Sequence, residues 1–218
     1  MGRNFNGSTD WLSRGTALLA NVPISIAGFF NPTVINADGI VVGLGDATAT
    51  NNPVYHMYHN TGQHWVEAEA SGDVDDETAH TSTFIAQLVT WHVCATFGST
   101  SSRKIYLNGN LEGSSTVTVN TTNTMTDTRI GNMCLNISGF TLNGIISTAA
   151  VWGAELAASE ASALAAGFSP KLIRASALKG YCRMLGGFNP EPDFCGGSWA
   201  LVGAPTFTDV MNTRLYNP

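Results

Sequence analysis

Two glutamates at alternate positions come closest to catalytic chemistry in this sequence: Glu67 and Glu69, within HWVEAEASGD. Side chains two positions apart on a β-strand point to the same face of the sheet. Two carboxylates on one face, roughly 5 Å apart, are the pair that a retaining glycoside hydrolase uses as nucleophile and acid. The competing interpretation is that both glutamates belong to a solvated sheet face, where charged side chains usually lie.

Three histidines in VYHMYHNTGQH have the residue type of a zinc site. Val, Tyr and the preceding Pro53 favour a strand for this segment, and positions three apart on a strand point to opposite faces. His56 and His59 therefore cannot easily share a metal ion. We expect these two residues and His64 to be exposed or to lie at an interface.

An acidic cluster follows the glutamate pair and consists of Asp73, Asp75, Asp76 and Glu77. Like charges this close repel one another, and the spacing is not that of an EF-hand loop, so we interpret the cluster as a solvated loop. The four cysteines have no CxxC spacing, which argues against a zinc knuckle or a disulfide framework. We expect no metal site and no cofactor.

Composition sets the class of the protein that must position these residues. The chain has 218 residues, of which 44% are hydrophobic and 12% charged, and the formal net charge is -6. Its ten Lys and Arg residues are scattered singly, so no basic stripe could bind nucleic acid. No apolar run reaches the roughly 18 to 20 residues of a membrane span, and the first residues do not read as a signal peptide, so we expect a soluble protein made in a cytoplasm.

Short runs rich in Val, Ile, Phe, Tyr, Trp and Thr, separated by Gly, Asn, Asp and Pro, predict an all-β sandwich. In the strand Thr90 to Phe97, the alternation places Trp91, Val93, Ala95 and Phe97 on the core face. The other expected strands cover residues 23–31, 40–44, 54–59, 63–70, 81–86, 104–107, 111–116, 128–133 and 141–152.

Three further features organise the chain. Asn108-Gly109 between two alternating runs is typical of a type I′ hairpin turn. Residues 157–166 predict one short helix, ended by Gly167 and Pro170 and packed on the sheet by Leu156, Leu164 and Phe168. The Gly- and Pro-rich residues 170–218 predict an extended tail with short strands at 179–184 and 199–202.

These pieces resemble a known family. Phe5-Asn6-Gly7-Ser8, PISI leading into Phe29, TWHVCATF, KIYLNGNLEG, TRIGN and FTLNGIISTAAVWGAEL occur in the order and spacing of a laminin G-like domain of the concanavalin A-like lectin/glucanase superfamily. The resemblance implies a jelly-roll sandwich of two antiparallel sheets over residues 1–169, with the tail of residues 170–218 packed on the same domain or on neighbouring subunits. Glycosidases of this superfamily typically carry Glu-x-Asp-x-x-Glu, and the third acid is absent after Glu69, so we expect no catalytic residue and no enzymatic activity.

The tail resembles the C-terminal segment of laminin G-like proteins encoded among bacteriophage structural genes, through Ile173-Arg174, Tyr181, Leu185-Gly186-Gly187 and Gly203-Ala204-Pro205-Thr206. This resemblance implies a non-enzymatic virion protein, foremost a capsid decoration protein that stabilises the head. Its expected partners are the major capsid protein or other virion proteins and further copies of itself, with neither nucleic acid nor membrane among them.

The alternative function is a lectin-like module of a phage tail or fibre that recognises host glycan. Tyr55, Tyr58 and Trp65 are the candidate glycan contacts, although Tyr55 and Tyr58 are expected to face opposite ways. Some laminin G-like domains bind calcium through acidic rim loops, which marks Asp46 and Asp127 for inspection without assigning them a metal. Mass spectrometry of purified particles would separate the decoration protein from this alternative.

Overall fold

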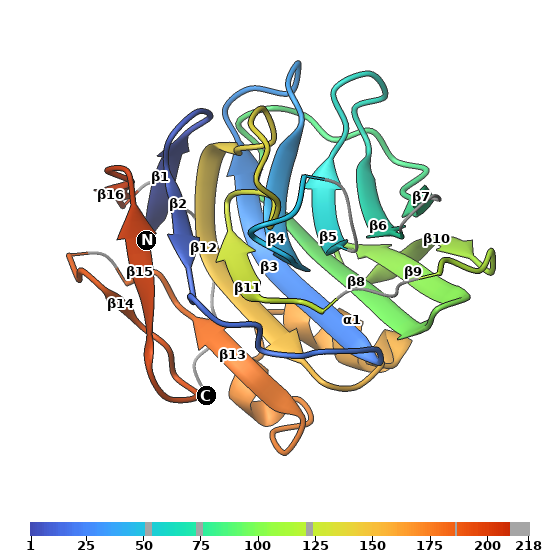
Figure 1. Ribbon diagram of the computed structural model, residues 1–218. Helices are drawn as coiled ribbons and strands as arrows, with labels where there is room; N and C mark the ends of the chain where they lie inside the picture. Colours follow the sequence, from blue (N-terminus) through green and yellow to red (C-terminus); the bar gives the residue numbers. More distant parts are fainter. Residues whose placement is uncertain (51–53, 73–75, 121–123, 186, 210–218) are drawn as a thin grey trace.

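The computed structural model describes residues 1–50, 54–72, 76–120, 124–185 and 187–209. These residues form an all-β sandwich of two antiparallel sheets with one short α-helix, as the sequence predicts (Figure 1). The two sheets, here called sheet A and sheet B, contain eight strands each among the described residues.

Sheet A has the strand order β10-β9-β8-β3-β12-β1-β16, and β13 pairs with the far end of β12. All of its pairs are antiparallel. Its strands are β1 (Gly2–Asn6), β3 (Ile24–Pro32), β8 (Trp91–Ser99), β9 (Ser102–Leu107), β10 (Asn110–Ser115), β12 (Asn143–Trp152), β13 (Leu178–Cys182) and β16 (Thr206–Thr208).

Sheet B has the order β14-β15-β2-β11-β4-β5-β6-β7. Its strands are β2 (Trp11–Ser13), β4 (Gly39–Gly45), β5 (Val54–His59), β6 (Val66–Ser71), β7 (Asp76–His80), β11 (Asp127–Ile130), β14 (Glu191–Pro192) and β15 (Ser198–Val202). Each sheet thus combines a run of consecutive strands with strands from distant parts of the chain, and the consecutive strands β5, β6 and β7 lie side by side at one end of sheet B.

The core lies between the sheets and follows the predicted alternation. Val93, Ala95 and Phe97 of β8 are buried there, which confirms the expected core face of this strand. The opposite face of β8 is buried as well, because Cys94 belongs to a second cluster with Trp152 and with the helical residue Leu164. Sheet A is therefore covered on both faces.

The helix α1 (Ala158–Ala165) lies on this outer face of sheet A and confirms the predicted helix (Figure 1). The side chain of Glu160 accepts a hydrogen bond from the Ala157 N–H, and Gly167 ends the helix with φ +92°. Leu156 and Leu164 are buried as expected. Phe168 is 49% exposed, so the expectation that it packs on the sheet is wrong. The short 3-10 helix η1 (Pro170–Leu172) follows.

The hairpin turn between β9 and β10 has the predicted form. Asn108 and Gly109 have φ values of 48° and 84°, the positive pair that a type I′ turn requires. The Asn108 side chain also accepts a hydrogen bond from the His92 N–H, which ties the turn to the neighbouring strand β8. The Asn-Gly pair is therefore a structural turn.

Residues 81–86 are not a strand, which corrects the prediction for this segment. The strand β7 lies just before it at Asp76–His80, and two of the acidic residues interpreted as a loop, Asp76 and Glu77, begin this strand. A strand at the edge of a sheet tolerates charged residues, since one of its sides faces solvent. Asp73 and Asp75 lie outside the described residues.

The described part of the tail adds strands to both sheets, namely β13 and β16 to sheet A and β14 and β15 to sheet B. Arg3 of β1 binds the tail through three hydrogen bonds. The Arg3 Nε donates to Glu191 Oε1 at 2.8 Å, and the two other guanidinium nitrogens donate to the carbonyls of Phe188 and Pro205. None of the helices in the described residues has the length and apolar character that a membrane crossing requires.

Candidate functional site

Polar and aromatic side chains gather on the outer face of strands β5, β6 and β7. Tyr58 pairs across the strands with Glu67, and Glu67 pairs with His80. Trp65, just before β6, stacks on His80 with ring centroids 3.9 Å apart and an angle of 9° between the rings. We call Tyr58, Trp65, Glu67, Glu69 and His80 the β5–β7 site.

Glu67 lies at the centre of this site and is 4% exposed. Tyr58 donates its hydroxyl hydrogen to Glu67 Oε2 at 3.0 Å, and the indole Nε1 of Trp65 donates to Glu67 Oε1 at 2.5 Å. Both carboxylate oxygens are thus occupied by donors. The expectation of a solvated glutamate face is wrong here, because the rings of Tyr58 and Trp65 cover this carboxylate.

Glu69 lies beside Glu67 on the same face, as the alternation predicts, and its side chain is 15% exposed. Burial alone would raise the pKa of this carboxyl, but the His56 imidazole 3.6 Å away and the hydrogen bond from the Ser71 hydroxyl lower the pKa to about 2. Burial, followed by the charges of Glu69 and Glu67, raises the pKa of Tyr58 well above its usual value. Near neutral pH, Glu69 is therefore an anionic acceptor and Tyr58 a hydrogen-bond donor.

Tyr55 does not join the other candidate glycan contacts. It is 2% exposed and packs edge-on against Phe97 in the core, with ring centroids 5.1 Å apart. Tyr58 points to the opposite face, as expected, and is 8% exposed because Ile40, Met133 and Leu135 cover its ring. Tyr55 is therefore too deep to contact a ligand at the surface, and Trp65 is the candidate aromatic that remains partly exposed.

The histidines do not form a metal site in the described residues. His56 and His59 are each 1% exposed, so the expectation that they are exposed or at an interface is wrong. His56 faces Glu69, whereas His59 packs over Gly39, and only His64 is exposed as predicted. No group of three His, Cys, Asp or Glu side chains in the described ranges is placed to hold a metal ion.

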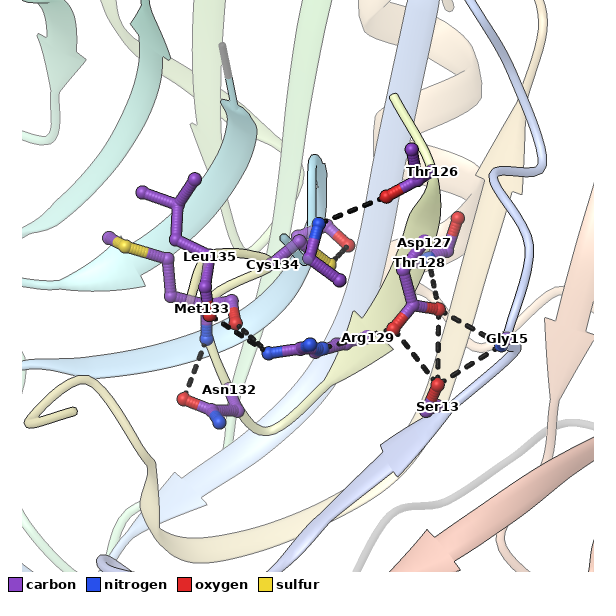
Figure 2. Close-up of polar contacts among 12 residues, drawn as sticks. Ser13, Gly15, Thr126, Asp127, Thr128, Arg129, Asn132, Met133, Cys134 and Leu135 are labelled. Atoms are coloured by element: carbon purple, nitrogen blue, oxygen red, sulfur yellow. Dashed lines mark hydrogen bonds and ion pairs between the residues drawn. The ribbon is translucent and has the colours of Figure 1, made fainter. Parts of the chain in front are cut away.

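The two rim acids are engaged in internal hydrogen bonds. Asp127 accepts from the Ser13 hydroxyl, the Gly15 and Thr128 N–H groups and Arg129 Nε, as Figure 2 shows. Arg129 in turn donates to the Met133 and Leu135 carbonyls, so the pair anchors the segment that covers Tyr58. The carboxylate of Asp127 is thus already neutralised by a guanidinium.

Asp46 directly follows β4 and lies close to Asp127, because Asp127 on β11 pairs with Gly45 at the end of β4. Its Oδ1 accepts from the Thr48 N–H at 2.9 Å, from the Thr48 hydroxyl at 2.7 Å and from the Thr126 hydroxyl at 3.1 Å. These hydrogen bonds, the Thr48 N–H foremost, lower the pKa of the Asp46 carboxyl. Asp46 therefore stabilises the loop that follows β4.

A pocket of about 280 Å³ opens on the outer face of sheet A, on the opposite side of the sandwich from the β5–β7 site. Its floor includes Gly28 and Ala150, and Lys171 and Arg183 lie on its lining. Its aromatic walls are Phe29, Trp152, Phe168, Tyr181 and Phe194. Sequence reasoning did not find this pocket, because its residues come from β3, β8, β12, the end of α1 and the tail. The aromatic residues of the tail were the one feature of the sequence that could have indicated it.

Comparisons with known proteins agree with this architecture. A family model described as the concanavalin A-like lectin/glucanases superfamily matches residues 6–162. No curated protein sequence matches the chain.

Among solved structures, a SAP-like pentraxin from Limulus polyphemus has a TM-score of 0.60 and 16% identity, covering 75% of this chain and 81% of that one. The carbohydrate-binding module CBM40 of the Ruminococcus gnavus IT-sialidase, bound to α2,3-sialyllactose, has a TM-score of 0.62 and 16% identity, covering 75% and 96%. Domains LG4-5 of the mouse laminin α1 chain have a TM-score of 0.53 and 13% identity, covering 69% and 40%. At these identities the structural likeness shows the fold alone. The family model, however, matches most of the chain. The chain therefore belongs to the concanavalin A-like lectin/glucanases superfamily, as a laminin G-like domain.

Proposed function

We propose that this chain is a carbohydrate-binding module whose β5–β7 site contacts a glycan. One observation carries the proposal: the partly exposed indole of Trp65 is fixed between a hydrogen bond to Glu67 and a parallel stack on the exposed ring of His80. A rigid aromatic surface of this kind packs against the C–H face of a sugar ring with little loss of side-chain entropy.

The neighbouring groups supply the polar half of such a site. Glu69 is an anionic acceptor, and Thr78 lies opposite it on β7, so sugar hydroxyl groups beside Trp65 would find both an acceptor and a hydroxyl partner. The segment with Met133 and Leu135, held by Arg129, borders the site on the side of Tyr58. Because hydrogen bonds to Glu67 hold Tyr58 and Trp65 in place, the site is preorganised.

The fold is consistent with this proposal. The similar structures include a carbohydrate-binding module with a sialyllactose ligand in the Ruminococcus gnavus enzyme. The fold itself hosts unrelated functions, so the proposal depends on the residues of the β5–β7 site.

Replacing Trp65 by alanine is expected to weaken glycan binding at least tenfold, because the stacking surface is lost. A glycan array with the wild-type chain identifies the ligand, and isothermal titration calorimetry then gives the dissociation constant for each variant. Trp11→Ala is the matched control: Trp11 is also a partly exposed tryptophan of sheet B, but it lies on β2, across β11, β4 and β5 from β6. Equal losses in both variants, or an array without binding, would contradict the proposal.

The capsid decoration function remains a prediction, as do the virion location, the partners and the absence of enzymatic activity. A glycan-binding module on a phage tail or fibre would combine the tail resemblance with the β5–β7 site. Mass spectrometry of purified particles tests this: a few copies per particle favour a tail or fibre module, and a copy number on the scale of the capsid subunits favours a decoration protein.

A further inference from the structure

The pocket on the outer face of sheet A is a second, separate site with a different chemistry. Its floor is made of small residues, Ala27, Gly28 and Ala150, which leave room above the sheet. Its volume of about 280 Å³ lies just below the range for ligand pockets, roughly 300 to 1,000 Å³. The aromatic walls therefore fit an apolar body about one or two rings in size.

The charged groups that line this pocket are cations, and the other polar side chains are neutral. The lining residues given for the described chain include His92, Thr148, Ser169, Lys171, Tyr181 and Arg183, and none of them is Asp, Glu, Asn or Gln. A neutral sugar presents many hydroxyl hydrogens that need acceptors, and this lining offers few strong ones. A ligand with an anionic head group matches the lining better.

Two cations at the pocket have no carboxylate partner. In the described part of the chain, Arg3, Arg14, Lys104, Arg129 and Arg174 each lie within 3.4 Å of a carboxylate oxygen. Lys171 and Arg183 have no such partner there; instead, Lys171 Nζ and Arg183 Cζ lie 5.3 and 5.8 Å from the centre of the Phe194 ring. In a chain with a net charge of -6, this pair is a local positive site.

Two buried nitrogen atoms at the pocket also have no hydrogen-bond partner among the described residues. They are Arg183 Nε and His92 Nδ1. Buried polar groups in native proteins are nearly always paired with protein, water or ligand, and leaving one unpaired costs about 1 to 3 kcal/mol. A ligand whose anionic head reaches Arg183 would satisfy the first of these atoms.

We propose that this pocket binds a small organic acid, with one carboxylate held by Lys171 and Arg183 and a ring-sized apolar body between the aromatic walls. Arginine suits a carboxylate because its planar donors can bind both oxygens, and each charge-assisted hydrogen bond is stronger than a neutral one. The inference is independent of glycan binding, since the pocket and the β5–β7 site lie on opposite outer faces of the sandwich.

The probe is 2-naphthoate, with the uncharged 2-naphthamide as its shape-matched control. Titration followed by ¹H–¹⁵N NMR is expected to shift the amide signals of Gly28, Ala150 and Gly167, and to give at least tenfold tighter binding for the acid than for the amide. Arg183→Gln and Lys171→Gln should each reduce the affinity for the acid at least fivefold while leaving the affinity for the amide within twofold.

Lys179→Gln is the control variant, because it removes one exposed cation of β13 that does not line the pocket. Its affinity for the acid should stay within twofold of the wild type. Equal binding of acid and amide, no binding of either at millimolar concentration, or an equal loss in Lys179→Gln would overturn the proposal. Lys171 is exposed, so its variant keeps the test valid if Arg183→Gln proves unstable.

Discussion

Replacing Arg3 by methionine is expected to lower the free energy of unfolding by about 3 to 5 kcal/mol, because Glu191 is left as a buried charge without a partner. Glu191 is fully buried and the Arg3 side chain is 6% exposed, with 2.8 Å between Nε and Oε1. Arg3 also donates to the carbonyls of Phe188 and Pro205, which become unpaired in the variant. Urea unfolding followed by tryptophan fluorescence measures the change.

Two further variants identify the cause. Arg3→Met combined with Glu191→Leu should recover much of the loss, since the double variant removes both buried charges. Arg174→Gln breaks the more exposed ion pair with Glu160 and should cost less than about 1 kcal/mol. If Arg3→Met were as mild as Arg174→Gln, the tail would not depend on the Arg3 contact.

This ion pair also shows which part of the fold sequence reasoning could not reach. Arg3 and Glu191 are 188 positions apart, and neither lies in a pattern that identifies the other. The strands β3, β8, β9, β10 and β12 could be predicted because their own alternation and the Asn-Gly turn define them. The short strands β1 and β2 carry too few residues for a periodic signal, and pairing with neighbouring strands determines them.

The error at β7 has a similar cause. The residues 81–86 contain Thr, Phe and Ile and so match the composition of a strand, whereas Asp76–His80 contains charged residues that are rare in strands. The edge position of β7 in sheet B permits those charges, because only Ala79 of this strand is buried. Composition within a short window cannot reveal whether a strand lies at an edge.

Sequence reasoning could also predict only part of the candidate sites. The shared face of Trp65, Glu67 and Glu69 follows from positions two apart on one strand, and so does the opposite orientation of Tyr55 and Tyr58. The contact between Tyr58 and Glu67 depends on the register of β5 against β6, which the loop between them sets. The pocket of sheet A combines residues from α1, the tail and three strands, so only the assembled fold brings Lys171 and Arg183 together.

Acidification is expected to destabilise this protein in two steps, and the first of them begins well above the usual pKa of carboxyl groups. Burial lowers the pKa of His59 to about 4 and that of His92 to about 3, from an ordinary value of 6.5. Between pH 6.5 and these values the unfolded chain binds protons that the folded chain does not, so stability falls as the pH falls. Each histidine contributes a loss on the order of 3 kcal/mol or more, at about 1.4 kcal/mol per pKa unit. Below pH 4.5, Glu69 adds a second loss, because its folded pKa of about 2 lies below the ordinary value.

Urea unfolding at a series of pH values from 7.5 to 3.5 measures this dependence. His92→Phe keeps an aromatic ring beside Phe29 and removes the titrating group, so its stability should fall less steeply between pH 6.5 and 4 than that of the wild type. His64→Gln is the control, since His64 is exposed, and its curve should run parallel to the wild-type curve. A His92→Phe curve parallel to the wild type would mean that His92 accepts a proton in the folded protein. The pocket floor at His92 would then be open to water, because burial is what holds this imidazole neutral.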